Sequence, residues 1–404
     1  MSDTLFAVTG VGAVSPLGPN APELWSALRE GRSAIGPLGE ALGGGVGAMF
    51  AEAPQPDVDR RLLAAMDPFS VYSCAAAQEA LAQARLDAAP ERVGAIIGVG
   101  VGGVVTTDQG YRRLYAENRR VDALTLPKVM PSAAASNVSM AFGLKGPTFG
   151  TCSACASSAH AIVEATHWLR HGAVDAMVAG GVEAPFALGA LTAWRGLHIM
   201  ASDTCRPFSV GRKGLVMGEG AACLVLERLD SAQARGAQIL AVLAGFGVTA
   251  DAGHIVKPDR DSIIRTLRLA LADAGVAPGE VGYINAHGTG TQLNDVVESA
   301  ALQAVFGEGR VPVTTSTKAA TGHTMGGAGA IEAVIAIGAL REGFIPPTLN
   351  FLGPDPECPL DVCPNEARSA DVEVALSNSF AFGGLNVSLV LRRPQGGPCP
   401  TNRA

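Results

Sequence analysis

Residues 148–181 read TFGTCSACASSAHAIVEATHWLRHGAVDAMVAGG and carry the clearest signal of the fold. Residues 148–153 form a short strand-like run, and residues 155–171 place small residues at helical spacing. Residues 175–178 form a second apolar run, which ends at the glycines Gly180 and Gly181. This order predicts a strand, a tight turn, a helix and a second strand, which together make a βαβ unit.

A similar order recurs in the second half of the chain. Residues 311–316 are strand-like, residues 318–329 form a glycine-rich turn, and residues 330–340 have the small residues of a closely packed helix. Strands and helices that alternate in this way predict an α/β fold. The recurrence predicts an internal duplication, with residues 1–240 as the first half and residues 241–404 as the second.

The remaining predicted elements fit the same alternation. Helices are predicted at residues 21–29 and 68–86, and loops at residues 31–56. Further strands are predicted at residues 5–11, 93–99, 221–226, 281–286, 372–376 and 387–391, the last two flanking a link at residues 377–386.

The composition is that of a protein with a large core. Of 404 residues, 48% are apolar and only 17% are charged, which excludes intrinsic disorder. Lys and Arg number 30 against 37 Asp and Glu, so that the formal net charge is −7. An acidic chain argues against broad nucleic-acid binding and against binding to an anionic membrane surface.

No stretch of the sequence predicts a membrane span. The apolar run at residues 326–340 is too short for one, and Glu332 interrupts it. The first residues, MSDTLFAV, lack the basic region and the long apolar stretch of a signal peptide. We therefore expect a cytoplasmic protein, in which disulfides are rare.

Cys155 is a candidate nucleophile because it begins the predicted helix of the βαβ unit. A helix N-terminus stabilises a thiolate and can lower the pKa of a cysteine to roughly 3.5–7.5. Its backbone N–H groups can also bind a developing oxyanion. The alternative is an unreactive buried thiol, the commoner fate of a cysteine. Cys152, on the strand side of the turn, is the rival nucleophile.

The spacing of Cys152 and Cys155 also occurs in zinc sites. No second CxxC pair and no spaced pair of histidines accompanies it, so that we expect no metal.

Two further clusters follow predicted strands. The run NAHGTGT places His287 at the end of a strand and before the hydroxyls of Thr289 and Thr291. The alternative is a glycine-rich phosphate cradle, but the spacing differs from GxGxxG and from a P-loop. The run TKAATGH places Lys318 and His323 across a glycine turn.

Glu332 lies on the helix behind this second turn and would be a nearly buried carboxylate. Such a group needs a partner, and Lys318 is the candidate. The alternative is a plain structural ion pair. The run SNSFAFGG, residues 377–384, offers backbone N–H groups and two aromatic rings, or else a simple hairpin with core Phe residues. Taken together, one Cys, two His, a Lys and a Glu at such turns predict nucleophilic acyl chemistry.

The motifs resemble those of the β-ketoacyl-[acyl-carrier-protein] synthases, in family order over nearly the whole chain. The matching pieces are residues 9–12 (TGVG), the Cys155 turn, residues 180–183 (GGVE), 206–208 (RPF), 218–220 (GEG), the HGTGT loop, the turn from Lys318 to His323, and SNSFAFGG. The resemblance is closest to ketosynthases of rhizobial nodulation-factor synthesis and of type II polyketide systems. Residues 66–70 (MDPFS), 126–135 (LPKVMPSAAA), 203–207 (DTCRP) and 355–358 (DPEC) carry it.

The resemblance implies a thiolase-like fold, a five-layered α-β-α-β-α sandwich of two similar halves, with a Cys-His-His site. By motif match, Cys155 is the nucleophile, His287 and His323 are the two histidines, and Lys318 and Glu332 support them. Four further residues are matched to substrate binding: Thr289 and Thr291 on the phosphopantetheine arm, the gating Phe382 whose N–H joins that of Cys155 in the oxyanion hole, and Phe380. Val101, in the glycine-rich turn after the strand at residues 93–99, is expected to bind substrate as well.

The family's reaction is a decarboxylating Claisen condensation of a malonyl thioester with an acyl chain held on cysteine, in fatty acid or polyketide synthesis. It uses no metal or redox cofactor, because the substrates are carried on the phosphopantetheine of an acyl carrier protein. The implied partners are that carrier protein and either a second copy of the chain or a chain-length-factor paralogue. Carrier proteins of this type are acidic, so a local basic patch is expected, with Arg60, Arg61, Lys128, Arg195 and Lys213 as candidates and Arg60, Arg61 and Arg195 preferred. Arg206 and Arg212 are expected instead to have a structural role, in stabilising the turn before Gly218.

Two alternatives and two departures accompany this reading. A non-catalytic partner subunit that shapes a shared tunnel would lack Cys155. A thiolase acting on coenzyme A would use two cysteines and one histidine, and the second histidine, His323, argues against it. Asn294 and Ala381 stand where relatives have glycine, and Ala381 predicts a stiffer gate beside Phe382.

Overall fold

The computed structural model describes residues 5–50 and 52–395. Within these ranges, ten strands pair into one sheet. Their order across the sheet is β10 (Val313–Thr315), β9 (Tyr283–Asn285), β13 (Val374–Ala381), β14 (Leu385–Arg392), β8 (Ala241–Ala250), β1 (Phe6–Val14), β7 (Gly220–Arg228), β6 (Ala176–Glu183), β4 (Val93–Val99) and β5 (Thr148–Thr151).

The two halves of this sheet repeat one arrangement. In the first half the order is β5-β4-β6-β7-β1, and in the second it is β10-β9-β13-β14-β8, which is the same order when strands are counted along the chain. The directions also match, because β4 runs parallel to β5 and β6 as β9 does to β10 and β13. The internal duplication is thus visible in the topology, while a division into domains at residue 240 stays a prediction.

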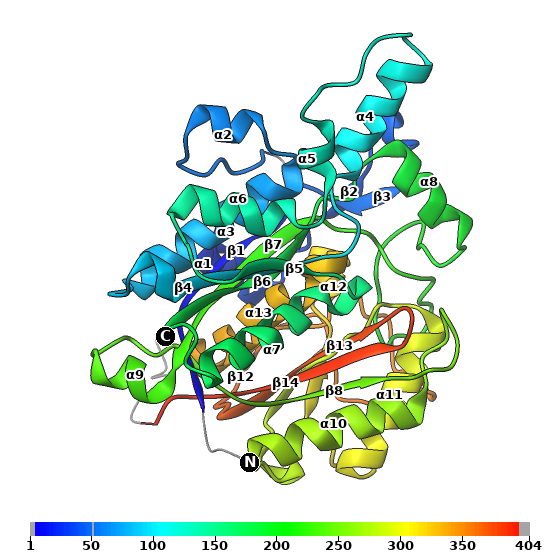
Figure 1. The fold of residues 1–404 in the computed structure, drawn as a ribbon. Helices are drawn as coiled ribbons and strands as arrows, with labels where there is room; N and C mark the ends of the chain where they lie inside the picture. Colours follow the sequence, from blue (N-terminus) through cyan, green and yellow to red (C-terminus); the bar gives the residue numbers. More distant parts are fainter. Residues whose placement is uncertain (1–4, 51, 396–404) are drawn as a thin grey trace.

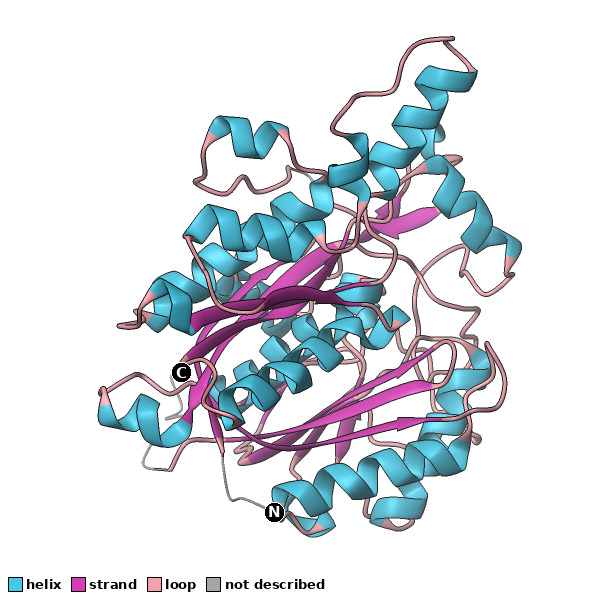
Figure 2. Cartoon of the chain, in the orientation of Figure 1, coloured by secondary structure: helices cyan, strands magenta, loops and turns pink. Residues whose placement is uncertain are grey.

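The halves separate into two layers because β1 and β8 pair over only three residues, from Phe6 opposite Leu243 to Val8 opposite Ala241. Two helices fill the space between the layers, and others cover the outer faces (Figures 1 and 2). The inner helices are α7 (Ser157–Arg170) and α13 (Ala328–Glu342), and the outer ones include α3 (Pro68–Ala84), α6 (Ala133–Phe142), α10 (Arg260–Ala274) and α11 (Gln292–Phe306). This five-layered α-β-α-β-α arrangement confirms the predicted fold.

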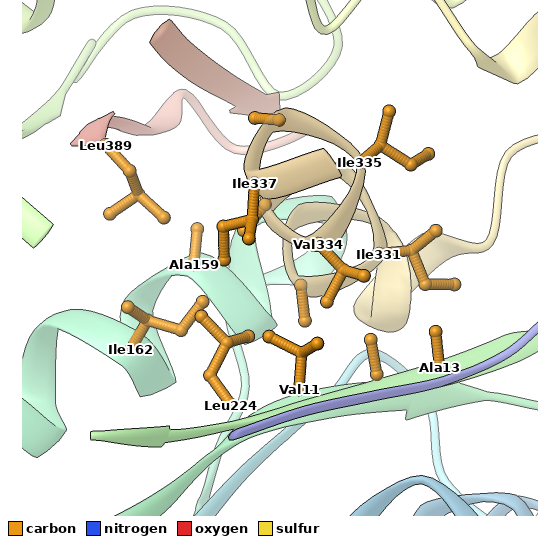
Figure 3. Packing of buried hydrophobic residues seen from close by; sticks show 14 of the residues in the cluster. Val11, Ala13, Ala159, Ile162, Leu224, Ile331, Val334, Ile335, Ile337 and Leu389 are labelled. Carbon is orange, nitrogen blue, oxygen red and sulfur yellow. The ribbon is translucent and has the colours of Figure 1, made fainter. Parts of the chain in front are cut away.

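The central layer is the most apolar part of the molecule. Every residue of α13 from Ala328 to Leu340 is buried, as expected for a helix that contacts a sheet on both sides. Figure 3 shows Val334 of α13 above Val11 of β1, with Leu389 of β14 on the opposite side. The one charged side chain in this stretch, Glu332, is therefore held in an apolar surrounding.

The other elements lie around this core. They are α1 (Ala21–Arg29), α2 (Arg60–Ala64), α4 (Val104–Tyr115), α5 (Thr125–Val129), α8 (Leu188–Gly196), α9 (Leu229–Ala234), α12 (Lys318–Thr321), and the short strands β2 (Ile35–Pro37), β3 (Val46–Ala48), β11 (Phe344–Ile345) and β12 (Arg368–Ser369). In Figure 1, α4 and the loop that follows it project from one corner. None of the helices in the described ranges is long and apolar enough to cross a membrane.

The structure corrects four local predictions. Residues 31–56 contain the hairpin of β2 and β3, not only loops. Gly180 and Gly181 lie inside β6 and do not end it. A Cβ at Gly180 would stand 2.0 Å from the carbonyl oxygen of Ala222 on the neighbouring strand. Close packing, and not a turn, therefore requires glycine there.

The other two corrections concern the functional motifs. The helix after Cys155 begins at Ser157, and Cys155 itself lies in a short 3₁₀ turn, Ala154–Ala156. Residues 377–381, predicted as a link, continue β13, so that the turn between β13 and β14 is only residues 382–384.

Candidate active site

A cavity of about 460 Å³ brings together most of the predicted site residues. Those that line it are Cys155, His287, Thr289, Thr291, His323, Phe380 and Phe382. They come from both halves of the chain, at the ends of strands β5, β9 and β13 and in the turn after α12. Val101 does not line this cavity, and 55% of its surface is exposed.

Cys155 is held at the inner end of the cavity between β5 and α7. Its side chain is only 6% exposed, and its Sγ lies 3.1 Å from Nε2 of His323. Burial raises the pKa of the Cys155 thiol to about 12, although the charge of Lys318 and the backbone N–H of Phe382 act in the opposite direction. The predicted lowering of this pKa by the helix N-terminus is wrong, because desolvation is the largest influence on the thiol and Cys155 lies in the 3₁₀ turn before α7.

Cys152, the rival nucleophile, has a different environment. It is exposed, it does not line the cavity, and its Sγ contacts the carbonyl oxygen of Gly100 at 3.4 Å.

His323 faces Cys155 with a defined ring nitrogen. The backbone N–H of Met325 donates to Nδ1 of His323 at 3.3 Å, which assigns the ring proton to Nε2. Nε2–H then points at the sulfur of Cys155. Burial and the charge of Lys318 lower the pKa of His323 well below its usual value, so that the ring is neutral and can donate one hydrogen bond.

His287 lies beside His323, with ring centroids 5.4 Å apart and ring planes at 83°. Burial, then Lys318 and His323, lower the pKa of His287 well below its usual value. Sγ of Cys155 and one ring nitrogen of each histidine lie within 4.8 Å of one another. This ligand set could also hold a soft divalent ion. The expectation of no metal stays a prediction.

Lys318 and Glu332 form a buried ion pair behind the histidines, as the sequence predicted. Nζ of Lys318 also donates to the carbonyl oxygen of His287 at 2.6 Å. Burial raises the pKa of Glu332 to about 7, while the charge of Lys318 lowers it. Lys318 therefore fixes the backbone at His287, and its charge acts on Cys155 more strongly than the opposing charge of Glu332.

Three buried carboxylates hold the loops of the site, and the sequence analysis gave them no role. Glu183 accepts hydrogen bonds from the backbone N–H groups of Gly100 (2.9 Å), Val101 (3.1 Å), Gly102 (3.3 Å) and Gly326 (3.1 Å). It thus ties the Val101 turn to the turn after His323. The signal available was a Glu at the end of a buried strand, which requires partners.

The other two carboxylates act on the HGTGT loop. Glu298 accepts hydrogen bonds from the N–H groups of His287 (2.9 Å) and Gly288 (2.8 Å), and Asp295 accepts one from Gly290 (3.2 Å). Burial raises the pKa of Glu298 to about 7 and that of Asp295 to about 6. Within the loop, the hydroxyls of Thr289 and Thr291 lie 2.9 Å apart.

Phe382 begins the turn between β13 and β14, where Gly383 and Gly384 have φ values of +82° and +69°. Its backbone N–H acts to lower the pKa of Cys155, as the smallest of the influences on that thiol, and both residues line the cavity. Its ring stacks on Trp194, a residue of α8 that also lines the cavity and that the sequence analysis missed.

The predicted docking residues differ in their exposure and in their contacts. Arg60 and Arg61 are exposed on α2 and do not line the cavity. The side chain of Lys128 is 14% exposed and lies 3.6 Å from Asp122. Arg195 donates to the carbonyl oxygens of Leu42 (2.9 Å) and Gly44 (2.6 Å), so that it clamps a loop.

Arg206 and Arg212 have structural contacts, as expected. Arg206 pairs with Asp203 at 2.9 Å, and the buried Arg212 pairs with Asp355 and lies near Asp295. The exposed cations that do line the cavity are Lys213 and Lys257.

Two family models match the chain. The N-terminal domain of β-ketoacyl synthases matches residues 6–232, and the C-terminal domain matches residues 240–352. Nodulation protein E of Rhizobium sp. (strain N33) is 46% identical over 400 residues, covering 97% of this chain and all of that protein. The 3-oxoacyl-[acyl-carrier-protein] synthase 2 of Staphylococcus aureus (strain COL) is 38% identical over 406 residues, covering 96% of this chain and 97% of that protein.

Solved structures of ketosynthases have the same fold. The ishigamide ketosynthase/chain length factor superposes with a TM-score of 0.93 at 33% identity, covering 97% of this chain and all of that one. A type II polyketide synthase acyl-carrier protein in complex with its ketosynthase contains a chain with a TM-score of 0.89 at 27% identity, with the same coverage. The cavity, its Cys-His-His cluster and these matches agree: the chain belongs to the β-ketoacyl synthase family and is a condensing acyltransferase of the 3-oxoacyl-[acyl-carrier-protein] synthase type.

Proposed function

We propose that Cys155, His287 and His323 carry out the two half-reactions of this condensing enzyme. The observation that carries the proposal is the meeting of these three side chains at the inner end of one cavity, with Nε2 of His323 3.1 Å from Sγ of Cys155. Nucleophile and hydrogen-bond donor are thus within contact distance before any substrate binds.

In the first half-reaction, the sulfur of Cys155 attacks the carbonyl carbon of an acyl thioester. The backbone N–H groups of Cys155 and Phe382 hold the oxyanion of the tetrahedral intermediate. The bond to the carrier sulfur breaks, the acyl group stays on Cys155, and the proton of the Cys155 thiol ends on the departing carrier thiol. Because burial keeps the resting thiol protonated, the sulfur becomes reactive only as this proton leaves.

In the second half-reaction, a malonyl thioester occupies the cavity and loses carbon dioxide. Its thioester oxygen gains negative charge as the enolate forms, and neutral His287 and His323 can each donate one N–H to that oxygen. The enolate carbon then bonds to the acyl carbon on Cys155. The carbon–sulfur bond breaks, a β-ketoacyl thioester results, and the Cys155 thiolate takes up one proton.

Lys318 and Glu332 support this chemistry from behind. Lys318 holds the carbonyl of His287 and places a positive charge near the sulfur, while Glu332 balances that charge in the apolar interior. Thr289, Thr291 and Phe380 line the cavity along which a phosphopantetheine arm reaches Cys155. Val101 lies outside the lining of this cavity, and its contact with the substrate stays a prediction. No metal or redox group enters the proposal.

The experiment that tests these roles compares the two close cysteines. Cys155→Ala should abolish condensation and acyl-enzyme formation, whereas Cys152→Ala should retain both, because only Cys155 lies in the cavity with His323. Mass spectrometry of peptides after incubation with an acyl carrier-protein thioester should place the adduct on Cys155. An adduct on Cys152 would contradict the proposal.

The alternatives do not fit the cavity. A thiolase needs a second catalytic cysteine, and Cys155 is the sole cysteine among the described residues that line the cavity. A non-catalytic subunit would not need the Cys155–His323 contact.

The partners we propose are an acyl carrier protein and a second ketosynthase-fold chain, either another copy or a chain-length factor. Support comes from the edge strand β5, which pairs only with β4 within the described residues. Near that edge lie the exposed side chains of Val101, Met130 and Met140. Native mass measured with and without a chain-length-factor paralogue distinguishes the two assemblies.

The pathway we propose is that of the nodulation-factor and type II polyketide ketosynthases. The 46% identity to nodulation protein E over nearly the full chain supports it.

A further inference from the structure

Trp194 makes a contact that the catalytic roles above do not use. It lies on α8, outside both sheets, and its ring stacks on that of Phe382 with centroids 6.1 Å apart and planes 25° apart. Both residues line the cavity that contains Cys155. α8 is thus in contact with the turn between β13 and β14 at the residue that faces the same cavity as Cys155.

The rest of the turn is held from the opposite side. The N–H of Gly383 donates to the carbonyl oxygen of Ile255 at 2.8 Å, and the N–H of Asp251 donates to the carbonyl oxygen of Gly384 at 2.9 Å. These bonds fix the two glycines, and a third, from the N–H of Gly384 to the carbonyl oxygen of Ala381 at 3.0 Å, closes the turn around Phe382. The Phe382 side chain has no polar group, so that only its packing contacts, the stack on Trp194 among them, determine how the ring lies.

We propose that Trp194 is a positioning residue for acyl transfer. Its indole holds the Phe382 ring in one orientation. This keeps the Phe382 N–H directed at the sulfur of Cys155, where the oxyanion forms. Trp194 acts through Phe382 and does not touch the reacting atoms. The inference rests on the proposed role of the Phe382 N–H in the oxyanion hole.

The test separates oxyanion stabilisation from simple access to the thiol. Acylation of Cys155 by an acyl-pantetheine thioester needs the oxyanion hole, whereas alkylation by iodoacetamide does not. Because a stacked aromatic pair contributes roughly 0.5–1.5 kcal/mol, Trp194→Ala should lower the maximal acylation rate by about 2- to 13-fold. Iodoacetamide should react with Cys155 in this variant at least as fast as in the unmodified protein.

Two further variants control for packing. Trp194→Phe keeps a flat ring and should restore the acylation rate, whereas Trp194→Leu should not. Leu188→Ala removes a side chain of the same helix that does not line the cavity, and should leave the acylation rate unchanged.

Several outcomes would overturn the inference. An unchanged acylation rate in Trp194→Ala would show that the stack does not position the N–H. Equal losses in acylation and alkylation, or full rescue by Trp194→Leu, would show that Trp194 only fills space. An unmodified protein that gains no acyl group on Cys155 would contradict the proposed catalytic roles, and this inference with them.

Discussion

The reactivity of Cys155 depends on a balance that the sequence could not resolve. Its position before a helix predicted a lowered pKa, and the structure does place an N–H donor and a lysine charge near the sulfur. Burial of the side chain acts in the opposite direction and is the larger effect, since its pKa rises to about 12. The structure places this residue in the cavity, where its role as nucleophile stays a prediction, and its protonation state depends on how completely two halves of the chain enclose it.

This balance makes a prediction about pH. With a pKa of about 12, the thiolate fraction of Cys155 in the free enzyme should rise about tenfold per pH unit between pH 6 and 9. The rate of alkylation by iodoacetamide should rise with the same slope. Peptide-resolved mass spectrometry measures this rate for Cys155 separately from the exposed Cys152. A rate that levels off between pH 6 and 8 would instead indicate a stable thiolate paired with a charged imidazole.

At the scale of elements, glycines in the strands determine where the catalytic turn lies. A Cβ at Gly98 of β4 would stand 2.3 Å from the backbone carbon of Ser157, and one at Gly181 of β6 would stand 2.5 Å from Cβ of Ser158. The first residues of α7 therefore pack directly against the backbones of β4 and β6 at these two glycines. This contact brings the turn with Cys155 to the end of the cavity.

Enlarging one of these glycines should disturb both stability and chemistry. Gly98→Ala should lower the free energy of unfolding by about 1–3 kcal/mol, because the added methyl group overlaps backbone atoms that cannot rotate away. It should also slow acylation of Cys155. Urea unfolding and single-turnover acylation measure the two effects. Gly36→Ala, where nothing lies within 4 Å, is the matched control and should change stability by less than about 0.5 kcal/mol.

The same elements show what could be predicted from the sequence. The helix at residues 21–29 and the strand at residues 93–99 have the predicted bounds, because local periodicity and terminating residues determine them. Gly180 and Gly181 were misread as the end of a strand because the reasons for glycine are not local: the backbone of Ala222 in β7 lies against Gly180, and Ser158 of α7 lies against Gly181. The partner of Glu332 was predictable from charge burial alone, but the stacking of Trp194 on Phe382 joins residues 188 positions apart and had no sequence signal.

At the scale of the whole molecule, a chain with a net charge of −7 must bind an acidic carrier protein. Docking then depends on where unpaired cations lie relative to the cavity. The sequence predicted docking at Arg60, Arg61, Lys128 and Arg195. In the structure, Arg195 donates hydrogen bonds to loop carbonyls and Lys128 is largely buried. Lys257 is exposed, lines the cavity, and makes no ion pair within the described residues, whereas Arg61 is exposed on α2 away from the lining.

These positions give a prediction about the carrier protein. Lys257→Glu should raise KM for an acyl carrier-protein substrate several-fold, because an acidic carrier must approach the cavity past this side chain. It should leave turnover of a free pantetheine thioester nearly unchanged, and the effect should shrink as salt rises from low to physiological strength, over which the screening length falls from about 30 to about 8 Å. Arg61→Glu is the comparison, since it makes the same charge change on α2. A larger rise in KM from Arg61→Glu would show that the carrier docks on α2 and that its prosthetic arm, not its surface, passes Lys257.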